Sequence, residues 1–169
     1  MTDLQRAILI LQDGTTFRGR PWGARGRAIG PVRLDPTATG FAEALADPLN
    51  AGGLVLFTYP NVGNTGHENQ ELVAAGCIAR EPARRPSHWQ SAGPLPEAMA
   101  AAGVVGISHL DTRALTRHLV QTGPQLGAIF SGEALPLPQW QLTESDNSAL
   151  PADVVASLLE VFAELEGQD

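Results

Sequence analysis

Short apolar runs separated by glycine-rich and polar stretches fill most of the first 131 residues. The run over 7–11, followed by Asp13-Gly14 and by 15–18, predicts an antiparallel hairpin with a type I′ turn, because both turn residues tolerate positive φ. The glycines between residues 19 and 30 predict a loop-rich stretch. Further runs have the length and composition of buried strands, and they span 54–59, 71–79 and 127–131.

Two helical segments are predicted between these strands. A short helix over 40–46 is expected to be capped by Thr39 and stopped by Pro48. An alanine-rich helix over 95–102 is expected to end at Gly103, since glycine readily takes the left-handed conformation that follows a helix. Strands and helices therefore alternate without a strict βαβ rhythm, and the pattern predicts a mixed α/β fold.

A third helix, over 111–122, has the clearest termini. Asp111 can accept hydrogen bonds from the free amides of the first turn, and Leu110 and Leu115 have the spacing of a hydrophobic staple. Gly123, followed by a proline, ends the segment. The sequence therefore predicts a well-fixed helix that begins directly after the G-I-S-H-L string at 106–110.

Charge divides the chain in two. Residues 1–132 carry all eleven arginines and ten carboxylates, a formal +1, whereas residues 133–169 carry eight carboxylates and no base, a formal −8. We interpret 1–132 as a folded body and 133–169 as an acidic linker with a C-terminal amphipathic helix that begins near Pro151. This helix packs on its own domain or holds a partner chain, and its apolar stripe consists of Val154, Val155, Leu158, Leu159, Phe162 and Leu165.

Composition excludes several classes of protein. A net charge of −7 argues against an extended nucleic-acid face. The absence of lysine excludes a Walker-type phosphate loop and a Schiff-base lysine, and a single cysteine, Cys77, excludes disulfides within the chain. No apolar run has the length of a signal-peptide core or a membrane span, so we expect a soluble, cytoplasmic protein.

Candidate catalytic residues do not form a recognisable set. The string over 106–110 has the order of a nucleophile elbow, but Leu110 stands where the second glycine is needed. The four histidines lack metal-ligand spacing, and Cys77 lies inside an apparent strand, where it is expected to be a small buried residue. Arg80, with Arg84 and Arg85, forms a small basic patch, read as a solvated loop face or as a contact for an anion or acidic partner.

Longer strings resemble one family, and they occur in its order over 7–131. They are Asp13-Gly14-Thr15, Thr39-Gly40-Phe41, Phe57-Thr58-Tyr59-Pro60 with Gly63-Asn64, Pro86-Ser87 with Trp89, and Gly106-Ile107-Ser108 followed by Asp111-Thr112-Arg113-Ala114-Leu115-Thr116-Arg117. The last matches the string G-I-S-x-x-D-T-R-A-L-T-R. The chain thus resembles the N-terminal domain of the small chain of glutamine-dependent carbamoyl-phosphate synthetase.

The resemblance implies a fold and a role. It implies a swivelling β/β/α three-layer domain over 1–132, which in that family docks the small chain on the large synthetase chain. The family's glutaminase half, with its cysteine on a strained turn and its later His–Glu pair, is expected to be absent, and Cys77 aligns with a strand position that has no catalytic role. No catalytic residue, metal or cofactor is therefore expected in this chain.

Three hypotheses follow for function. The leading one is a non-catalytic docking module related to the synthetase that supplies carbamoyl phosphate for pyrimidine and arginine biosynthesis; its partner is a large chain or a separate amidotransferase. The alternatives are one half of a split small chain that works with a separate glutaminase, and a homo-oligomeric structural protein held by residues 150–169. The expected partner-binding residues are Tyr59, Asn64, Asp111, Thr112 and Arg113, of which Asp111 also has a capping role.

Overall fold

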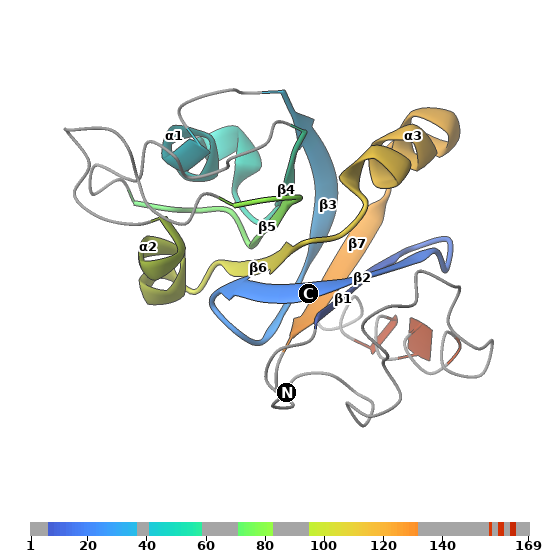
Figure 1. Ribbon diagram of the computed structural model, residues 1–169, viewed down its shortest axis with the longest axis horizontal. Coiled ribbons are helices and arrows are strands. Elements are labelled where there is room, and N and C mark those ends of the chain that lie inside the picture. The colour runs from blue at the N-terminus through green and yellow to red at the C-terminus, as the bar shows by residue number, and fades with distance from the viewer. Residues whose placement is uncertain are drawn as a thin grey trace.

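The computed structural model describes residues 7–36, 41–58, 71–82 and 95–131, together with five isolated positions between 156 and 164. These residues form a mixed α/β domain, as predicted (Figure 1). Its strands are β1 (Ala7–Leu11), β2 (Thr16–Gly23), β3 (Arg27–Asp35), β4 (Leu54–Phe57), β5 (Gly76–Ala79), β6 (Val105–Ser108) and β7 (Leu126–Ser131). Its helices are α1 (Phe41–Ala46), the short 3₁₀ helix η2 (Pro48–Asn50), α2 (Leu95–Ala102) and α3 (Thr112–Thr122).

The strands close into a barrel in the order β1-β2-β6-β5-β4-β3-β7. β3, β4, β5 and β6 run parallel to one another, and the remaining pairs are antiparallel. Parallel neighbours need a crossover connection, and α1 and α2 lie in two of these crossovers. Figure 1 shows both helices on one side of β4 and β5 and α3 on the other side. The barrel therefore has a parallel half covered by helices and an antiparallel half.

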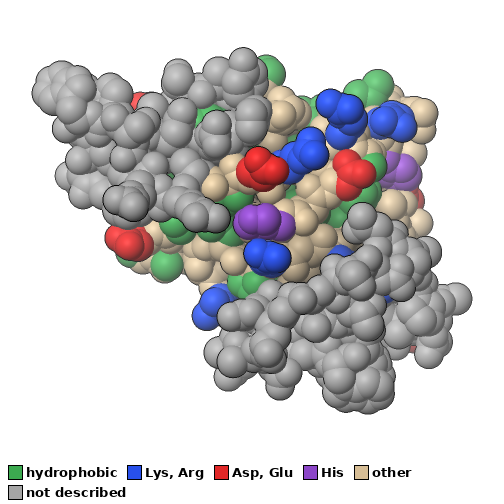
Figure 2. Space-filling view, in the orientation of Figure 1, with side chains coloured by type: hydrophobic (Ala, Val, Ile, Leu, Met, Phe, Trp, Pro, Cys, Tyr) green, Lys and Arg blue, Asp and Glu red, His purple; other side chains and the backbone are tan. Residues whose placement is uncertain are grey.

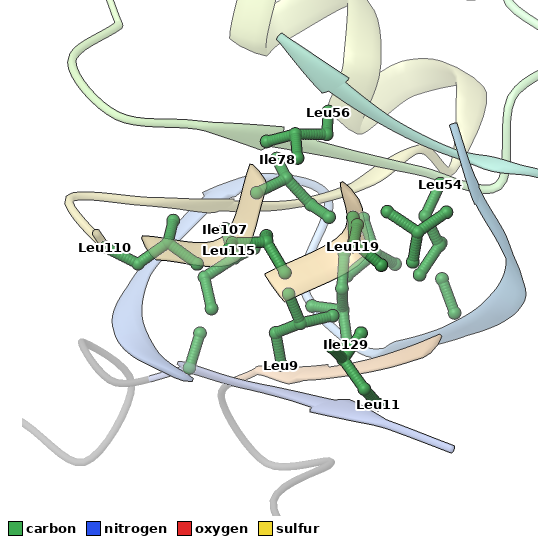
Figure 3. Packing of buried hydrophobic residues seen from close by; sticks show 14 residues of the cluster. Leu9, Leu11, Leu54, Leu56, Ile78, Ile107, Leu110, Leu115, Leu119 and Ile129 are labelled. Atoms are coloured by element: carbon green, nitrogen blue, oxygen red, sulfur yellow. The ribbon is translucent and has the colours of Figure 1, made fainter. Parts of the chain in front are cut away.

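Alternating side chains divide the core in two. Leu54 and Leu56 point into the barrel, whereas Val55 and Phe57 point outward against α1 and α2. The rings of Phe41 and Phe57 meet edge to face, with centroids 5.1 Å apart. α3 contributes to the interior as well, and Figure 3 shows its side chains among those of the strands; the labelled residues are Leu9, Leu11, Leu54, Leu56, Ile78, Ile107, Leu110, Leu115, Leu119 and Ile129.

The first hairpin is confirmed, but the type I′ turn is wrong. Of the turn residues, only Gly14 has a positive φ, of 92°. Its amide donates to the Leu11 carbonyl at 2.9 Å, and the Leu11 amide donates to the Thr15 carbonyl at 2.8 Å. This is a three-residue loop over 12–14 whose last residue is the left-handed Gly14. Asp13 stays at negative φ, and from there its carboxylate accepts from the Thr15 amide at 3.0 Å.

The loop predicted over the glycines is also wrong, because β2 extends to Gly23 and β3 begins at Arg27. Two of these glycines, Gly19 and Gly30, mark close approach of backbones, whereas Gly23 and Gly26 have positive φ values of 77° and 143°. A Cβ atom at Gly19 would collide with the Ser108 carbonyl oxygen, and one at Gly30 would collide with the carbonyl oxygen of Gly52. Glycine is required where backbones approach this closely.

The strand predicted over 71–79 is confirmed only from Gly76 onward. The amides before it bond elsewhere: those of Val73 and Ala74 donate to the Leu45 carbonyl at the end of α1, at 2.8 and 3.0 Å. The strand predicted over 54–59 ends at Phe57. The amides of Val73 and Ala74 already bond to the end of α1, so they cannot join a strand ladder, and β5 therefore begins only at Gly76.

The remaining predictions are settled to different extents. Helix α2 ends before Gly103, whose φ is 78°, as predicted. The proposed cap Thr39 lies outside the described residues. The predicted C-terminal helix is described at five positions, all helical, namely Ala156, Leu159, Glu160, Ala163 and Glu164. Within the described part of the chain, no helix has the length and apolar character to cross a membrane.

Candidate functional site

Polar residues gather at the edge of the barrel where the parallel strands end. Thr58 follows β4, Arg80 and Glu81 follow β5, and His109 follows β6. Carboxyl ends of neighbouring parallel strands share one edge of a sheet, which is where open α/β sheets bind ligands. α3 begins at the same edge with Thr112. Figure 2 shows arginine, acidic and histidine side chains exposed together on the face that is viewed.

The start of α3 is held as the sequence predicts. The Asp111 carboxylate accepts a hydrogen bond from the Ala114 amide at 3.0 Å. Leu110 and Leu115, on either side of this cap, are both buried in the barrel interior. The cap and the staple together fix the direction of the helix, so the exposed side chains of its first turns have defined positions.

Two adjacent hollows lie on this edge. The first, which we call the mixed hollow, has a volume of about 450 Å³. Its described lining carries both signs of charge and consists of Arg80, Glu81, His109, Leu110, Asp111 and Arg113. Its arginines and carboxylates form no ion pair with one another. It is therefore a balanced polar surface that offers both donors and acceptors.

The second, which we call the arginine hollow, has a volume of about 590 Å³. Its described lining consists of three arginines and three threonines: Thr58, Arg80, Thr112, Arg113, Thr116 and Arg117. No carboxylate belongs to this described lining, so its formal charge is positive. Arg80 and Arg113 line both hollows and join them into one surface.

His109 stands between the strand end and α3 in an unusual backbone conformation. Its φ is 62°, the only positive value among the described residues other than glycine. Its amide donates to the Arg80 carbonyl at 2.9 Å, and its Nδ1 atom shares a 2.7 Å hydrogen bond with Ser108 Oγ. Partial burial and the charge of Arg20 lower the pKa of His109, while Glu81 opposes the shift. The ring is therefore mainly neutral at pH 7.

The Ser108–His109 contact does not make a nucleophile elbow. Ser108 is only 2% exposed, so its hydroxyl is shielded from a substrate carbonyl. Leu110, which replaces the second glycine of that motif, packs into the barrel interior. Cys77 is fully buried in the outer core, as predicted, and desolvation raises the pKa of its thiol. A thiol that stays protonated is a poor nucleophile and a poor metal ligand.

The structure brings together three of the five predicted partner-binding residues. Asp111 lines the mixed hollow, Thr112 lines the arginine hollow, and Arg113 lines both. Tyr59 and Asn64 lie outside the described residues, as do Arg84 and Arg85 of the predicted basic patch.

Sequence reasoning missed several lining residues. Arg117 carried a local signal, because it stands four residues after Arg113 on the same side of the predicted helix. Thr58 and His109 carried no such signal, since only the order of the parallel strands places them beside α3. In the described ranges, no three histidine, cysteine or acidic residues are grouped as a metal site would require.

Comparisons with known proteins identify one family. The family model for the carbamoyl-phosphate synthase small chain, CPSase domain, matches residues 9–129. The carbamoyl phosphate synthase small chain of Xanthomonas axonopodis pv. citri is 48% identical over 134 residues, which cover 76% of this chain and 34% of the relative. That of Streptomyces coelicolor is 47% identical over 135 residues, covering 77% of this chain and 36% of the relative.

The matched region has a limited extent. The chain spans about a third of the length of these curated relatives, in their N-terminal part. A family model that matches most of the chain, together with identities near one half, establishes common descent with that region. The chain therefore belongs to the carbamoyl-phosphate synthase small chain family and corresponds to its CPSase domain.

Proposed function

We propose that this chain is a non-catalytic docking module that binds a carbamoyl-phosphate synthase large chain through the surface formed by the two hollows. One observation carries the proposal: Arg80, Arg113 and Arg117 are exposed at one edge of the barrel, and no described carboxylate forms an ion pair with them. Arginine is enriched at protein interfaces, where its planar group pairs with carboxylates in defined geometry.

The surface is suited to docking because its parts are rigidly placed. Arg80 directly follows a buried strand, and Arg113 stands in the first turn of a capped helix. Tyr59 and Asn64 belong to the proposed contact as well, because their segment continues from Thr58, which lines the arginine hollow. Interfaces built on preorganised backbone lose little conformational entropy on binding.

The chain is proposed to lack catalytic activity of its own. Glutamine hydrolysis of the kind the family carries out needs an activated thiolate, and Cys77 is the only cysteine of the chain. Burial raises the pKa of its thiol and removes it from solvent. We therefore expect purified protein to release no ammonia from glutamine, which a coupled ammonia assay measures. Ammonia release that a Cys77→Ser change abolishes would contradict this.

We further assign the domain to the swivelling β/β/α type, with the body over 1–132 and an acidic linker and helix over 133–169. Three layers support the fold type: the antiparallel half of the barrel, its parallel half, and the helices α1 and α2 outside the parallel half. The family match ends at residue 129, just before the charge changes sign at 133.

The C-terminal helix is proposed to cover the outer face of β1 and β7. Four side chains on that face are fully buried, although they belong to neither described core cluster: Ile8, Ile10, Ala128 and Phe130. Leu159 of the apolar stripe is partly buried, whereas Glu160 and Glu164 are exposed. This pattern favours packing on the chain's own barrel over a homo-oligomer held by residues 150–169.

The proposed setting is the cytoplasm, where the large chain is the primary partner. A separate glutaminase is a second partner in the same assembly if the small chain is split between two polypeptides. The two partners are separable by experiment, because large-chain binding does not require glutamine whereas glutamine-dependent synthesis requires the glutaminase.

The proposal is tested by mixing the full chain with a purified large chain and measuring their binding by calorimetric titration. We expect a one-to-one complex whose dissociation constant rises about tenfold or more in Arg113→Gln, as for a central arginine contact. Arg27→Gln, an equal charge change at the start of β3 and outside both hollows, is the matched control and is expected to bind like the wild type. No complex, or equal weakening by both variants, contradicts the proposal.

A further inference from the structure

The geometry points to a second use of the arginine hollow: we propose that it binds the phosphate group of a small phosphate monoester, held by Arg80, Arg113 and Arg117. This goes beyond docking, because the ligand is a small molecule and binds the chain without a partner. The inference depends on the charge, the arrangement and the size of the hollow.

Among the described residues, nothing compensates the charge of the arginine hollow. Its described lining contributes three guanidinium groups and no carboxylate, and no described acidic residue forms an ion pair with any of the three. A phosphate monoester carries a charge of about −1.5 to −2 at pH 7, with three strong acceptor oxygens. A single carboxylate brings one charge and two oxygens, so phosphate matches three arginines better.

The arrangement surrounds one ligand group from two sides. Thr112 and Thr116, like Arg113 and Arg117, are spaced four residues apart and therefore stack along one side of α3. Thr58 and Arg80 reach the hollow from the ends of two neighbouring strands. The Thr116 hydroxyl donates to the Thr112 carbonyl at 2.7 Å. Its proton is thus used inside the helix, and the arginines remain the main donors to a ligand.

Arg113 and Arg117 also carry a cost for folding. Like charges four residues apart destabilise a helix, and no described acidic side chain pairs with either to offset this. A bound anion between the two groups removes the repulsion. The pair is thus better explained by binding than by the stability of α3.

The size of the hollow indicates a ligand larger than phosphate alone. A volume of about 590 Å³ falls within the range of small-molecule sites. The adjoining mixed hollow shares Arg80 and Arg113, and it adds the carboxylates of Glu81 and Asp111, which accept hydrogen bonds. We therefore infer a monoester whose organic part carries hydroxyl or amino donors toward this second hollow.

The test is a titration of the full chain with inorganic phosphate and then with glycerol phosphate, followed by NMR of the arginine Nε–H signals at constant ionic strength. We expect saturable shifts and tighter binding of glycerol phosphate than of phosphate. Affinity should fall at least tenfold in Arg113→Gln/Arg117→Gln and be unchanged in Arg27→Gln. Arg80→Gln, outside α3, gives an independent variant, and circular dichroism verifies that each variant is folded.

Three results would overturn the inference. They are shifts that rise linearly without saturation, equal loss of binding in Arg27→Gln, and acetate binding as tightly as phosphate. Failure of docking is a separate outcome, because large-chain binding is measured in phosphate-free buffer. A chain that binds the large chain but not phosphate contradicts this inference alone, and one that binds phosphate but not the large chain contradicts the docking proposal alone.

Discussion

The two ends of α3 use polar side chains in opposite ways. At its C-terminal end, His118 Nε2 lies 2.6 Å from the carboxylate of Asp13, in the turn between β1 and β2. The Gln125 side chain donates to the same carboxylate at 3.2 Å and to the Thr122 hydroxyl at 2.9 Å. At the N-terminal end, the arginines of the hollows have no described acidic partner.

The difference separates groups that the fold uses from groups that it leaves available. Asp13 accepts hydrogen bonds from residues distant in sequence, so its interactions are complete within the domain. Arg113 is exposed beside a hollow, and no described acidic residue pairs with it, which leaves its donors to a ligand or partner as far as the described residues go. Satisfied polar networks fix a structure, whereas unpaired arginines grouped at a concave surface indicate recognition. Both ends share the apolar side of the helix, which holds α3 in the barrel.

The largest expected effect comes from that shared side. Leu115 is fully buried in the barrel interior, so Leu115→Ala removes apolar contacts and leaves a cavity. We expect a loss of about 3 kcal/mol in the free energy of unfolding, measured by urea denaturation. Val120→Ala on the exposed side of the same helix, where the residue is 71% exposed, is the control. A change within about 0.5 kcal/mol is expected there. Equal losses would show that α3 is not packed as described.

The next effect belongs to the C-terminal end. Asp13→Asn removes the charge that His118 and the Thr15 amide contact, and we expect a loss of about 1 kcal/mol in unfolding free energy. Arg113→Gln, at the other end, is expected not to lower the urea midpoint, because it removes only the repulsion between Arg113 and Arg117. If Arg113→Gln destabilises as much as Asp13→Asn, the two ends do not differ and the comparison fails.

A smaller effect is expected in the pH dependence of stability. Burial alone would raise the pKa of Asp13, but hydrogen bonds from Thr15, His118 and Gln125 lower it well below its ordinary value. A carboxyl group whose pKa is lower in the folded state stabilises above its unfolded pKa of about 4 and loses this contribution as pH falls. Urea midpoints of wild type and Asp13→Asn should therefore differ at pH 6 and converge toward pH 2. A constant difference would contradict the assignment.

The smallest effect has the opposite sign. Arg117→Gln relieves the repulsion between Arg113 and Arg117, so we expect a gain of about 0.2–0.5 kcal/mol in unfolding free energy at low ionic strength. The gain should disappear in 0.5 M sodium chloride, because salt screens exposed charges. Thermal unfolding at both salt concentrations measures it. A loss of stability would mean that Arg117 has a structural partner.

Local patterns predicted the ends of α3 but not β3. Asp111, Leu115 and Gly123 lie within a few residues of the backbone groups they satisfy, so their roles follow from spacing alone. β3 contains Gly30 and Pro31, which weaken a strand pattern, and its existence depends on pairing with β7 and β4. Those partners are distant in sequence, and a local pattern does not contain them.

The site was only partly predictable for the same reason. Thr112 and Arg113 are neighbours in sequence and were identified together. Arg80 and Thr58 join them only because β4, β5 and β6 are adjacent and parallel, which brings their carboxyl ends to one edge. The charge balance of each hollow depends on this tertiary arrangement, and no local motif encodes it.

The most direct test measures large-chain affinity and unfolding free energy on the same two variants, Arg113→Gln and Asp13→Asn. The account predicts that Arg113→Gln weakens affinity about tenfold without lowering the urea midpoint, whereas Asp13→Asn lowers the midpoint and binds like the wild type. Wild-type affinity in Arg113→Gln, or equal weakening in both variants, would contradict the claim that the arginine-lined edge is the docking surface.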